Sequence, residues 1–237
     1  MCGRYTQLMS WRELVELYRL TDDQPAINVP AHYNVAPSQQ VPIVRLEDGK
    51  QHLAMVRWGL VPFWAKDLNI GYKMINARAE TVAEKPSFRA AFRKRRCLVP
   101  ASGFYEWKGP AGEKQPYYIT LSDGPMTFAG LWESWKNPES GETVESCTII
   151  VTRANELCAR IHDRMPVILA PNDFDPWLYS NTEPEQLKAL LEPYPAKAMT
   201  ASPVSKSVGN VRNDEPALIE PLGPEPAGGP WPLETHT

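Results

Sequence analysis

The chain has 237 residues and a mass of 26.7 kDa, with 43% hydrophobic and 22% charged residues, so it can bury a full core without disulfides or metals. It has no window of 18 uncharged apolar residues and no signal-peptide h-region, so we expect a cytoplasmic protein without a membrane span. The net charge of −3 includes five acids and no Lys or Arg in residues 214–237, which leaves +2 for residues 1–213.

Local sequence patterns predict short helices and many short strands along the chain. A helix is expected over Ser10–Leu20, where Ser10 and Glu13 have the spacing of a capping box. Short β-branched and aromatic segments bounded by Gly, Pro, Asn or Asp predict strands over Val41–Leu46, Leu53–Trp58, Cys97–Val99, Phe104–Trp107, Tyr117–Leu121, Thr127–Trp132, Cys147–Thr152 and Val167–Leu169. Further helices are expected over Ser87–Arg95, Asp173–Tyr179 and Glu183–Leu191.

The arrangement of these elements predicts the fold class. Turn sequences at Lys108–Gly112 and Ser122–Pro125 predict antiparallel hairpins, and the absence of alternating βα units argues against a doubly wound parallel sheet. We therefore expect one α+β domain over residues 1–213, with a curled antiparallel sheet or β-barrel-like core flanked by short helices. Residues 214–237 are acidic and contain six prolines, so we expect a disordered tail.

Cysteine and histidine usage excludes the common zinc sites. The chain has four cysteines and four histidines, and no CxxC pair. Cys97, Cys147 and Cys158 lie in apolar surroundings and are expected to be buried packing residues. No metal and no organic cofactor is expected.

Cys2 stands apart because it follows the initiator methionine. If Met1 is removed, the chain begins with a cysteine, which carries an α-amine and a thiol on one residue. An α-amine has a pKa near 7.8, against about 10.4 for lysine, so it is neutral roughly 400 times more often at neutral pH. A neutral amine attacks an aldehyde to give an imine, and the neighbouring thiol can close a thiazolidine ring. The alternative is that Cys2 has no chemical role.

Four other residues can carry chemistry or have ordinary structural roles. His162 is flanked by Asp163 and Arg164, which can fix its tautomer, or it is a surface residue. Glu106 lies in an apolar strand, where partial burial would raise its pKa toward general-acid use, or it faces solvent. Asn76 and Arg78 share a face if their segment is extended, which suits a sugar or phosphate ligand, or they form loop contacts.

A run of basic residues follows in the chain. Five cations occur among eight residues, namely Arg89, Arg93, Lys94, Arg95 and Arg96. This run predicts either a patch that faces phosphates or a solvated helix face. Exposed aromatic side chains at Phe63 and Trp64 can stack on unpaired bases.

Taken together, motifs spaced along the chain resemble those of the SOS response-associated peptidase family. The motifs are Met1–Tyr5, Tyr33–Pro37, Arg57–Pro62, Ile75–Glu80, Ser102–Trp107, Ile161–Pro166, and Pro203–Ser205 followed by Val208–Val211. The resemblance covers residues 2 to about 213. It implies a mixed α/β domain with a β-barrel-like core, which senses abasic sites in single-stranded DNA and forms a protective covalent crosslink through the N-terminal cysteine.

The resemblance also implies roles for individual residues. The catalytic residues are expected to be Cys2, Asn76, Glu106 and His162. Glu106 would move protons, His162 would hydrogen-bond the sugar oxygen or relay a proton, and Asn76 would position the sugar. Contacts to DNA are expected from Arg4, Asn34, Trp64, Arg78 and Arg89. The protein is expected to be a monomer that is cytoplasmic and associates with the nucleoid when bound to DNA.

Two rival functions remain open at this point. The first is a cysteine peptidase with self-processing activity, in which Cys2 works with His162 and Glu106. The second is a non-catalytic nucleic-acid-binding module, which would tolerate loss of Cys2. A weak DNA lyase activity is compatible with the crosslinking function, because strand nicking can follow imine formation.

Overall fold

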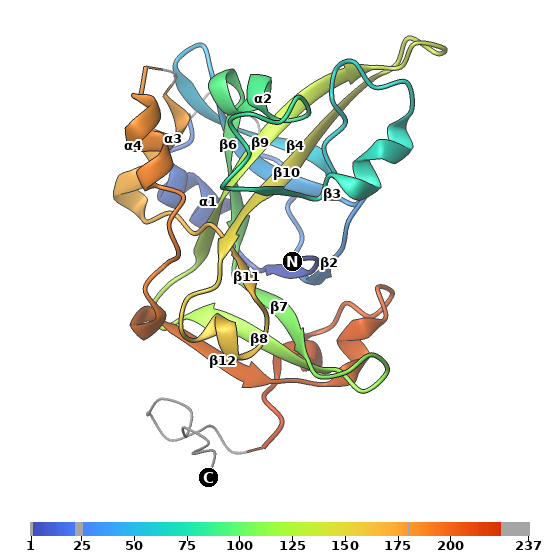
Figure 1. Ribbon diagram of the computed structural model, residues 1–237, viewed down its shortest axis with the longest axis vertical. Helices are drawn as coiled ribbons and strands as arrows, with labels where there is room; N and C mark the ends of the chain where they lie inside the picture. The colour runs from blue at the N-terminus through green and yellow to red at the C-terminus, as the bar shows by residue number, and fades with distance from the viewer. Residues whose placement is uncertain (1, 22–25, 180, 224–237) are drawn as a thin grey trace.

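The computed structural model describes residues 2–21, 26–179 and 181–223. These residues form one α+β domain with two β-sheets and a few short helices, which confirms the predicted fold class (Figure 1). The strands are β1 (Tyr5–Gln7), β2 (His32–Val35), β3 (Gln40–Glu47), β4 (Lys50–Trp58), β5 (Asn76–Arg78), β6 (Arg96–Ala101), β7 (Gly103–Lys108), β8 (Gln115–Leu121), β9 (Met126–Lys136), β10 (Thr143–Arg153), β11 (Arg164–Pro166) and β12 (Met199–Pro203).

The larger sheet closes into a barrel. Its strand order is β11-β10-β4-β3-β6-β9, and β9 also pairs with β10, so β10, β4, β3, β6 and β9 form a closed ring. Side chains alternate along the strands: Val41 and Ile43 of β3 face the interior, whereas Val44 faces outward. The interior cluster, which we call the barrel core, also contains Cys2 and Tyr5.

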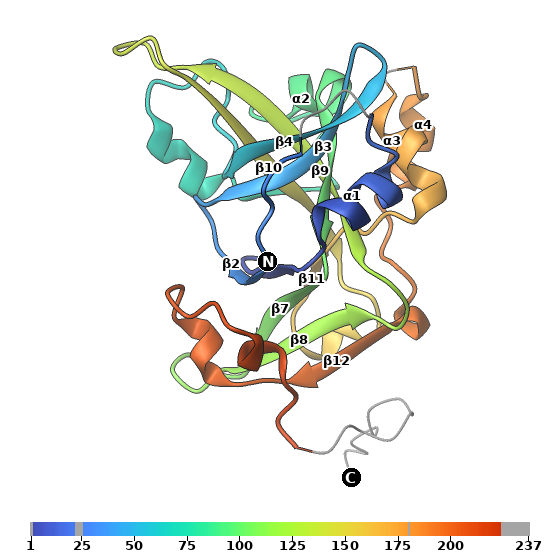
Figure 2. The same cartoon turned by 180° about the vertical axis from the view of Figure 1, so that it is seen from behind.

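The helices cover the outer face of the barrel. They are α1 (Trp11–Tyr18), α2 (Arg89–Lys94), α3 (Phe174–Leu178) and α4 (Pro184–Ala189). Figures 1 and 2 show α1, α3 and α4 together on one side of the barrel, with α2 near its upper end. The capping box predicted at Ser10 and Glu13 is confirmed at the start of α1, whose buried Leu14 and Tyr18 pack on the outer cluster. No helix of the described residues is long and apolar enough to cross a membrane.

The smaller sheet lies below the barrel in Figure 1 and has the order β12-β8-β7-β1-β2. Short 3-10 helices connect the remaining segments: η1 (Leu68–Lys73), η2 (Cys158–Arg160), η3 (Pro171–Asp173), η4 (Ala196–Ala198), η5 (Lys206–Gly209) and η6 (Pro216–Ile219). The hairpin predicted at Lys108–Gly112 joins β7 and β8. The first residues contact both sheets, because β1 belongs to the smaller sheet while Cys2 and Tyr5 pack in the barrel core.

Several strand predictions need correction. The turn at Ser122–Pro125 does not close a hairpin, because β8 and β9 belong to different sheets. The strand expected at Val167–Leu169 lies three residues earlier, at β11, and only Ile168 keeps an isolated bridge to Phe128. Two pairings are parallel, β10 with β4 and β10 with β5, so the sheet is mixed. β1, β2, β5 and β12 were not predicted, since three to five residues are too few to show a period.

The packed structure continues beyond the expected boundary at residue 213. Asp214 accepts hydrogen bonds from the backbone amides of Tyr33 and Asn34. Leu218 of η6 is buried beside Tyr105, and Val204 forms a bridge with Pro221. Residues 224–237 of the expected tail lie outside the described residues.

Candidate functional site

The first residues of the chain lie beside β7, which carries Glu106. The strands β1 and β7 are antiparallel, with Tyr5 opposite Phe104, and the amide of Tyr105 donates to the carbonyl of Arg4 at 3.0 Å. Continuing this register places Gly3 opposite Glu106. The fold therefore brings Cys2 and Glu106 together from positions about a hundred residues apart.

Both side chains are buried. Cys2 is 0% exposed and Glu106 is 3% exposed. Burial raises the pKa of the Cys2 thiol, and the negative charge of Glu106 adds to the rise. Burial also raises the pKa of Glu106, while the nearby His162 works in the opposite direction. The site thus holds a carboxyl group that keeps its proton to a higher pH than usual, next to a protonated thiol.

His162 follows η2 and lies in the connection between β10 and β11. Its backbone amide donates to the carbonyl of Cys158 at 2.8 Å. Its Nδ1 lies 3.0 Å from the amide of Arg164 and 2.9 Å from a carboxylate oxygen of Asp163. We take the Arg164 amide as the fixed partner, because the Asp163 side chain is largely exposed. A neutral ring that accepts at Nδ1 carries its proton on Nε2.

Asn76 begins β5, which pairs in parallel with β10 and is extended as the sequence predicted. Its Nδ2 donates to the carbonyl of Ile75 at 3.0 Å. Its Oδ1 is buried and accepts no hydrogen bond from the described residues. Ile75, the residue before Asn76, packs against the barrel core that contains Cys2.

Cys158 is a site residue that the sequence did not reveal. It is buried as expected of a packing cysteine, but burial and the charge of Glu106 raise its pKa to about 12. Its apolar neighbours gave only the signal of a core residue, and no local pattern connects it to Glu106. A second thiol therefore lies beside the same carboxyl group.

Arg4 and Asn34 have internal partners. Arg4 Nη1 donates to Asn34 Oδ1 at 2.7 Å and to the carbonyl of Val208 at 2.8 Å. Asn34 is buried, and its Nδ2 donates to the carbonyls of Val208, Asn210 and Asn213. Asn34 thus has a structural role, because it connects residues 208–213 to β2 and to Arg4.

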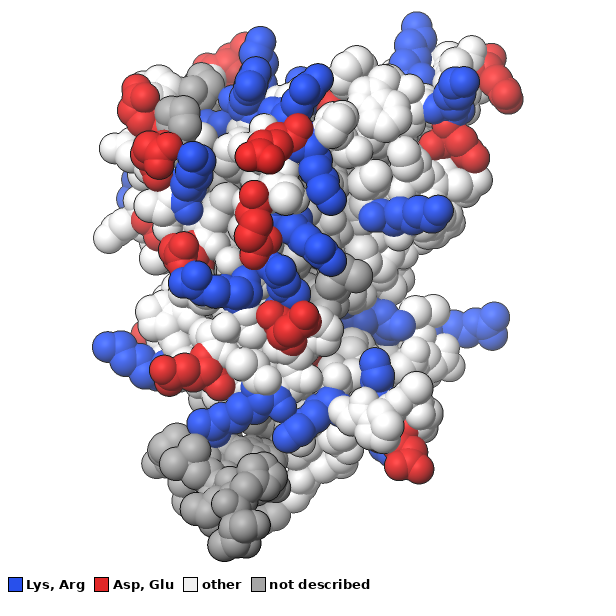
Figure 3. Space-filling view, in the orientation of Figure 1, with Lys and Arg blue, Asp and Glu red and all other residues white. Residues whose placement is uncertain are grey.

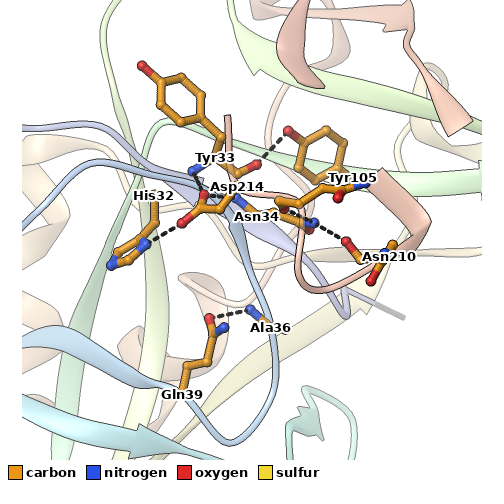
Figure 4. A network of polar contacts seen from close by, with 9 residues as sticks. His32, Tyr33, Asn34, Ala36, Gln39, Tyr105, Asn210 and Asp214 are labelled. Carbon is orange, nitrogen blue, oxygen red and sulfur yellow. Dashed lines mark hydrogen bonds and ion pairs between the residues drawn. The ribbon is translucent and has the colours of Figure 1, made fainter. Parts of the chain in front are cut away.

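Asp214 completes this connection, which we call the C-terminal clasp (residues 208–214). Figure 4 shows its carboxylate between His32, Tyr33 and Asn34, and its contact with His32 Nδ1 is 2.7 Å. The Tyr105 hydroxyl donates to the carbonyl of Tyr33 at 2.7 Å in the same network. The clasp fixes the strands that carry the first residues and Glu106.

The remaining residues expected to contact DNA lie on the surface. Arg78 and Arg89 are exposed, and Trp64 is 47% exposed. The run of five cations after Ser87 is split. Arg96 is buried and donates to four backbone carbonyls, and Arg95 pairs with Glu133 at 2.7 Å. Only part of the predicted basic patch therefore faces solvent.

The arrangement suits acid–base chemistry at the N-terminal residue. Glu106 can give and take a proton, His162 presents an N–H, and Asn76 offers a free acceptor. Among the described residues, no three His, Cys, Asp or Glu side chains gather to hold a metal ion.

Comparisons with known proteins agree with the motifs. A sequence model described as "SOS response associated peptidase (SRAP)" matches residues 1–211. "Abasic site processing protein YoqW" of Bacillus subtilis is 46% identical over 223 residues, which cover 93% of this chain and 99% of that protein. "Abasic site processing protein YedK" of Escherichia coli is 32% identical, covering 94% and 100%. A crystal structure from Bacteroides thetaiotaomicron superposes with a TM-score of 0.81 at 29% identity, covering 92% and 99%.

Proposed function

Because the chain belongs to the SOS response-associated peptidase family, as its motifs predict, we propose that it processes abasic sites in DNA. After removal of Met1, Cys2 forms a thiazolidine with the aldehyde of an abasic sugar in single-stranded DNA. The product is a covalent DNA–protein crosslink that protects the lesion.

One observation carries this proposal: the second residue of the chain is held against a buried carboxyl group. Cys2 and Glu106 couple electrostatically, and β1 fixes their register. Few functions need an acid–base residue beside the start of a chain. Chemistry on an N-terminal α-amine is one of them.

The first step joins the amine to the sugar. The α-nitrogen of Cys2 attacks C1 of the open-chain sugar and gives a carbinolamine. Glu106 protonates the hydroxyl group, which leaves as water, and an iminium ion remains. The raised pKa of Glu106 supports this step, because the carboxyl group keeps a proton to give at a higher pH than usual.

The second step closes the ring. The Cys2 sulfur adds to the iminium carbon, and the thiol proton returns to the Glu106 carboxylate. The net change is an aldehyde, an amine and a thiol converted to a thiazolidine and one water, with no oxidation or reduction. The raised pKa of the thiol favours this order, in which the amine attacks before the sulfur.

His162 and Asn76 position the sugar. The N–H at Nε2 of His162 can donate a hydrogen bond to the ring oxygen as the closed hemiacetal opens. The unpaired Oδ1 of Asn76 can accept from the α-amine or from a sugar hydroxyl. Arg78, which is exposed two residues after Asn76 on β5, contacts a flanking phosphate in this proposal.

A thiolate peptidase fits the site less well. Such an enzyme activates its cysteine by lowering the thiol pKa, whereas burial raises the pKa of Cys2. A peptidase would also keep activity when the α-amine is blocked.

The test uses a single-stranded oligonucleotide with one abasic site, run on a denaturing gel after mass spectrometry has confirmed loss of Met1. We expect a heat-stable shifted band without borohydride for the wild type. Cys2→Ala and a chain with a blocked α-amine should give none. Cys147→Ala, which removes an equally buried thiol of the barrel core, is the matched control and should crosslink like the wild type.

Cys2→Ser separates the two steps, because it keeps the amine and loses the sulfur. We expect a less stable adduct and more strand nicking than with the wild type. Absence of any band from a wild-type chain that starts at Cys2 would disprove the crosslinking function. Equal nicking by the wild type and Cys2→Ser would disprove the ring closure.

A further inference from the structure

A groove on the outer surface joins two segments that the site does not use. It lies where the loop after β4 meets α2, and its lining residues are Phe63, Ala90, Arg93, Lys94, Arg95 and Glu133. The aromatic and basic members are about thirty residues apart in the sequence. The fold therefore brings Phe63, one of the two aromatic residues noted in the sequence, next to part of the basic run.

The aromatic side of the groove is held in place. The amide of Ala65 donates to the carbonyl of Pro62 at 2.8 Å, and Trp135 Nε1 donates to the carbonyl of Ala65 at 2.7 Å. Ala65 and Trp135 belong to a small buried cluster, whereas Phe63 is 60% exposed. Because the turn is anchored at its end, the phenyl ring of Phe63 stays on the surface, where a stacked base would cover it.

The basic side keeps a net positive charge. Glu133 is buried and paired with Arg95, and one of its oxygens also accepts from the amide of Ser134 at 3.0 Å. Arg93 and Lys94 are exposed, so the groove's three cations and one carboxylate leave a formal charge of +2. Figure 3 shows Lys and Arg side chains at the top of the molecule, where α2 lies, with Asp and Glu side chains among them.

The loop that carries Phe63 begins after Trp58, in the barrel core that contains Cys2. Trp58 packs against Tyr5 at 5.2 Å between ring centroids and belongs to the barrel core with Cys2. Phe63 is five positions after Trp58, so their Cα atoms are at most about 18 Å apart. That span corresponds to roughly five stacked nucleotides at about 3.4 Å each.

We infer that the groove between Phe63 and α2 binds the single-stranded DNA several nucleotides away from the abasic site, with Arg93 and Lys94 on phosphates and Phe63 on a base. The inference rests on the proposed function and extends it: the protein reads a stretch of unpaired strand as well as the lesion. Arg93 and Lys94 supply affinity that depends on salt, and Phe63 supplies a preference for unpaired bases.

The test measures binding apart from crosslinking. Two single-stranded oligonucleotides carry a tetrahydrofuran abasic analogue, which has no aldehyde: a short one with about two nucleotides on each side, and a long one with about ten. The double variant Arg93→Gln/Lys94→Gln should bind the long oligonucleotide about tenfold more weakly at low salt. The slope of log K against log salt concentration should be shallower than that of the wild type by about 1.4, because two phosphate contacts are lost and each contributes about 0.7.

The controls make both results decisive. The short oligonucleotide should bind the double variant and the wild type equally. Arg12→Gln/Lys197→Gln, which removes one exposed Arg and one exposed Lys elsewhere, should bind the long oligonucleotide like the wild type. Phe63→Ala should weaken binding of the long single-stranded oligonucleotide about tenfold and leave binding of a long duplex unchanged. Thermal unfolding checks that each variant is folded.

The inference is overturned if the double variant binds the long oligonucleotide as the wild type does, or if short and long lose affinity equally. An equal loss for duplex and single strand on Phe63→Ala would remove the stacking role. Crosslinking of the wild type to a true abasic site is measured in parallel. Its failure would disprove the proposed function without affecting the binding comparison.

Discussion

The two ends of the barrel differ in which form of a buried group they favour: the charged form of Arg45 at one end and the neutral form of Glu106 at the other. At one end, Arg45 of β3 donates to Glu47 and Glu145 and lies 4.1 Å above the ring of Trp132. At the other end, Glu106 lies beside Cys2, and burial raises the pKa of both groups. Burial raises the pKa of Cys97 in the barrel core, and the Arg45 cation works in the opposite direction.

The difference separates a structural charge from a chemical one. Burial alone would lower the pKa of Arg45, but the hydrogen bonds to Glu145 and Glu47 raise it, so the cation is stable in place. Glu106 is shifted away from its usual pKa, which is typical of groups that transfer protons. The same barrel thus has one end with a paired ion network and one end with a buried carboxyl group whose pKa is raised.

The largest effect is expected at the site end. Glu106→Gln keeps the shape of the side chain but cannot exchange a proton, so crosslinking to an abasic oligonucleotide should slow about 100-fold. Band intensity over time on denaturing gels measures the rate. Glu145→Gln, at the opposite end, is the matched control and should crosslink at the wild-type rate. Equal rates for Glu106→Gln and the wild type would remove Glu106 from the mechanism.

The next effect tests how the C-terminal clasp supports the site end. Asn34→Ala leaves the carbonyl of Asn213 without its donor and takes one of two donors from the carbonyls of Val208 and Asn210. It also takes the acceptor from Arg4 Nη1, so the free energy of unfolding should fall by about 3 kcal/mol. Urea denaturation measures this change. Asn69→Ala removes an amide with exposed contacts to Asp67 and should cost far less. Similar losses for the two variants would show that the clasp does not stabilise the domain.

A smaller loss is expected at the closed end. Arg45→Met removes the guanidinium but keeps apolar volume, and its carboxylate partners are partly exposed and can be hydrated. The free energy of unfolding should therefore fall by about 2 kcal/mol, with an unchanged crosslinking rate. Arg12→Met on the exposed face of α1 serves as the control for stability. A large loss of crosslinking in folded Arg45→Met would mean that the two ends are coupled.

The smallest effect is a pH dependence of stability. Above about pH 4.3 the Glu106 carboxyl is ionised in the unfolded chain, while the folded chain keeps the proton until its raised pKa is passed. The stability that Glu106 contributes at low pH is thus lost as the pH rises through the folded pKa. Glu106→Gln should therefore gain stability relative to the wild type between about pH 4 and pH 8. A stability difference that stays constant with pH would contradict the raised pKa.

The sequence alone determined the features that depend on neighbours in the chain. The capping box at Ser10, the strand at Val41–Leu46 and the hairpin at Lys108–Gly112 follow from local patterns and are present in the fold. The motifs also identified the family and the barrel-like core. These features are readable because capping, side-chain alternation and tight turns are set within a few residues.

Tertiary structure decided everything that depends on distant partners. Arg96 looked like part of a phosphate patch, yet the carbonyls of Trp177 and Tyr179 draw it into the interior. The turn at Ser122–Pro125 crosses between sheets, and Asp214 joins the packed fold. Register and burial come from contacts between segments far apart in the chain. A local sequence pattern therefore does not show which distant partner a polar group will bind.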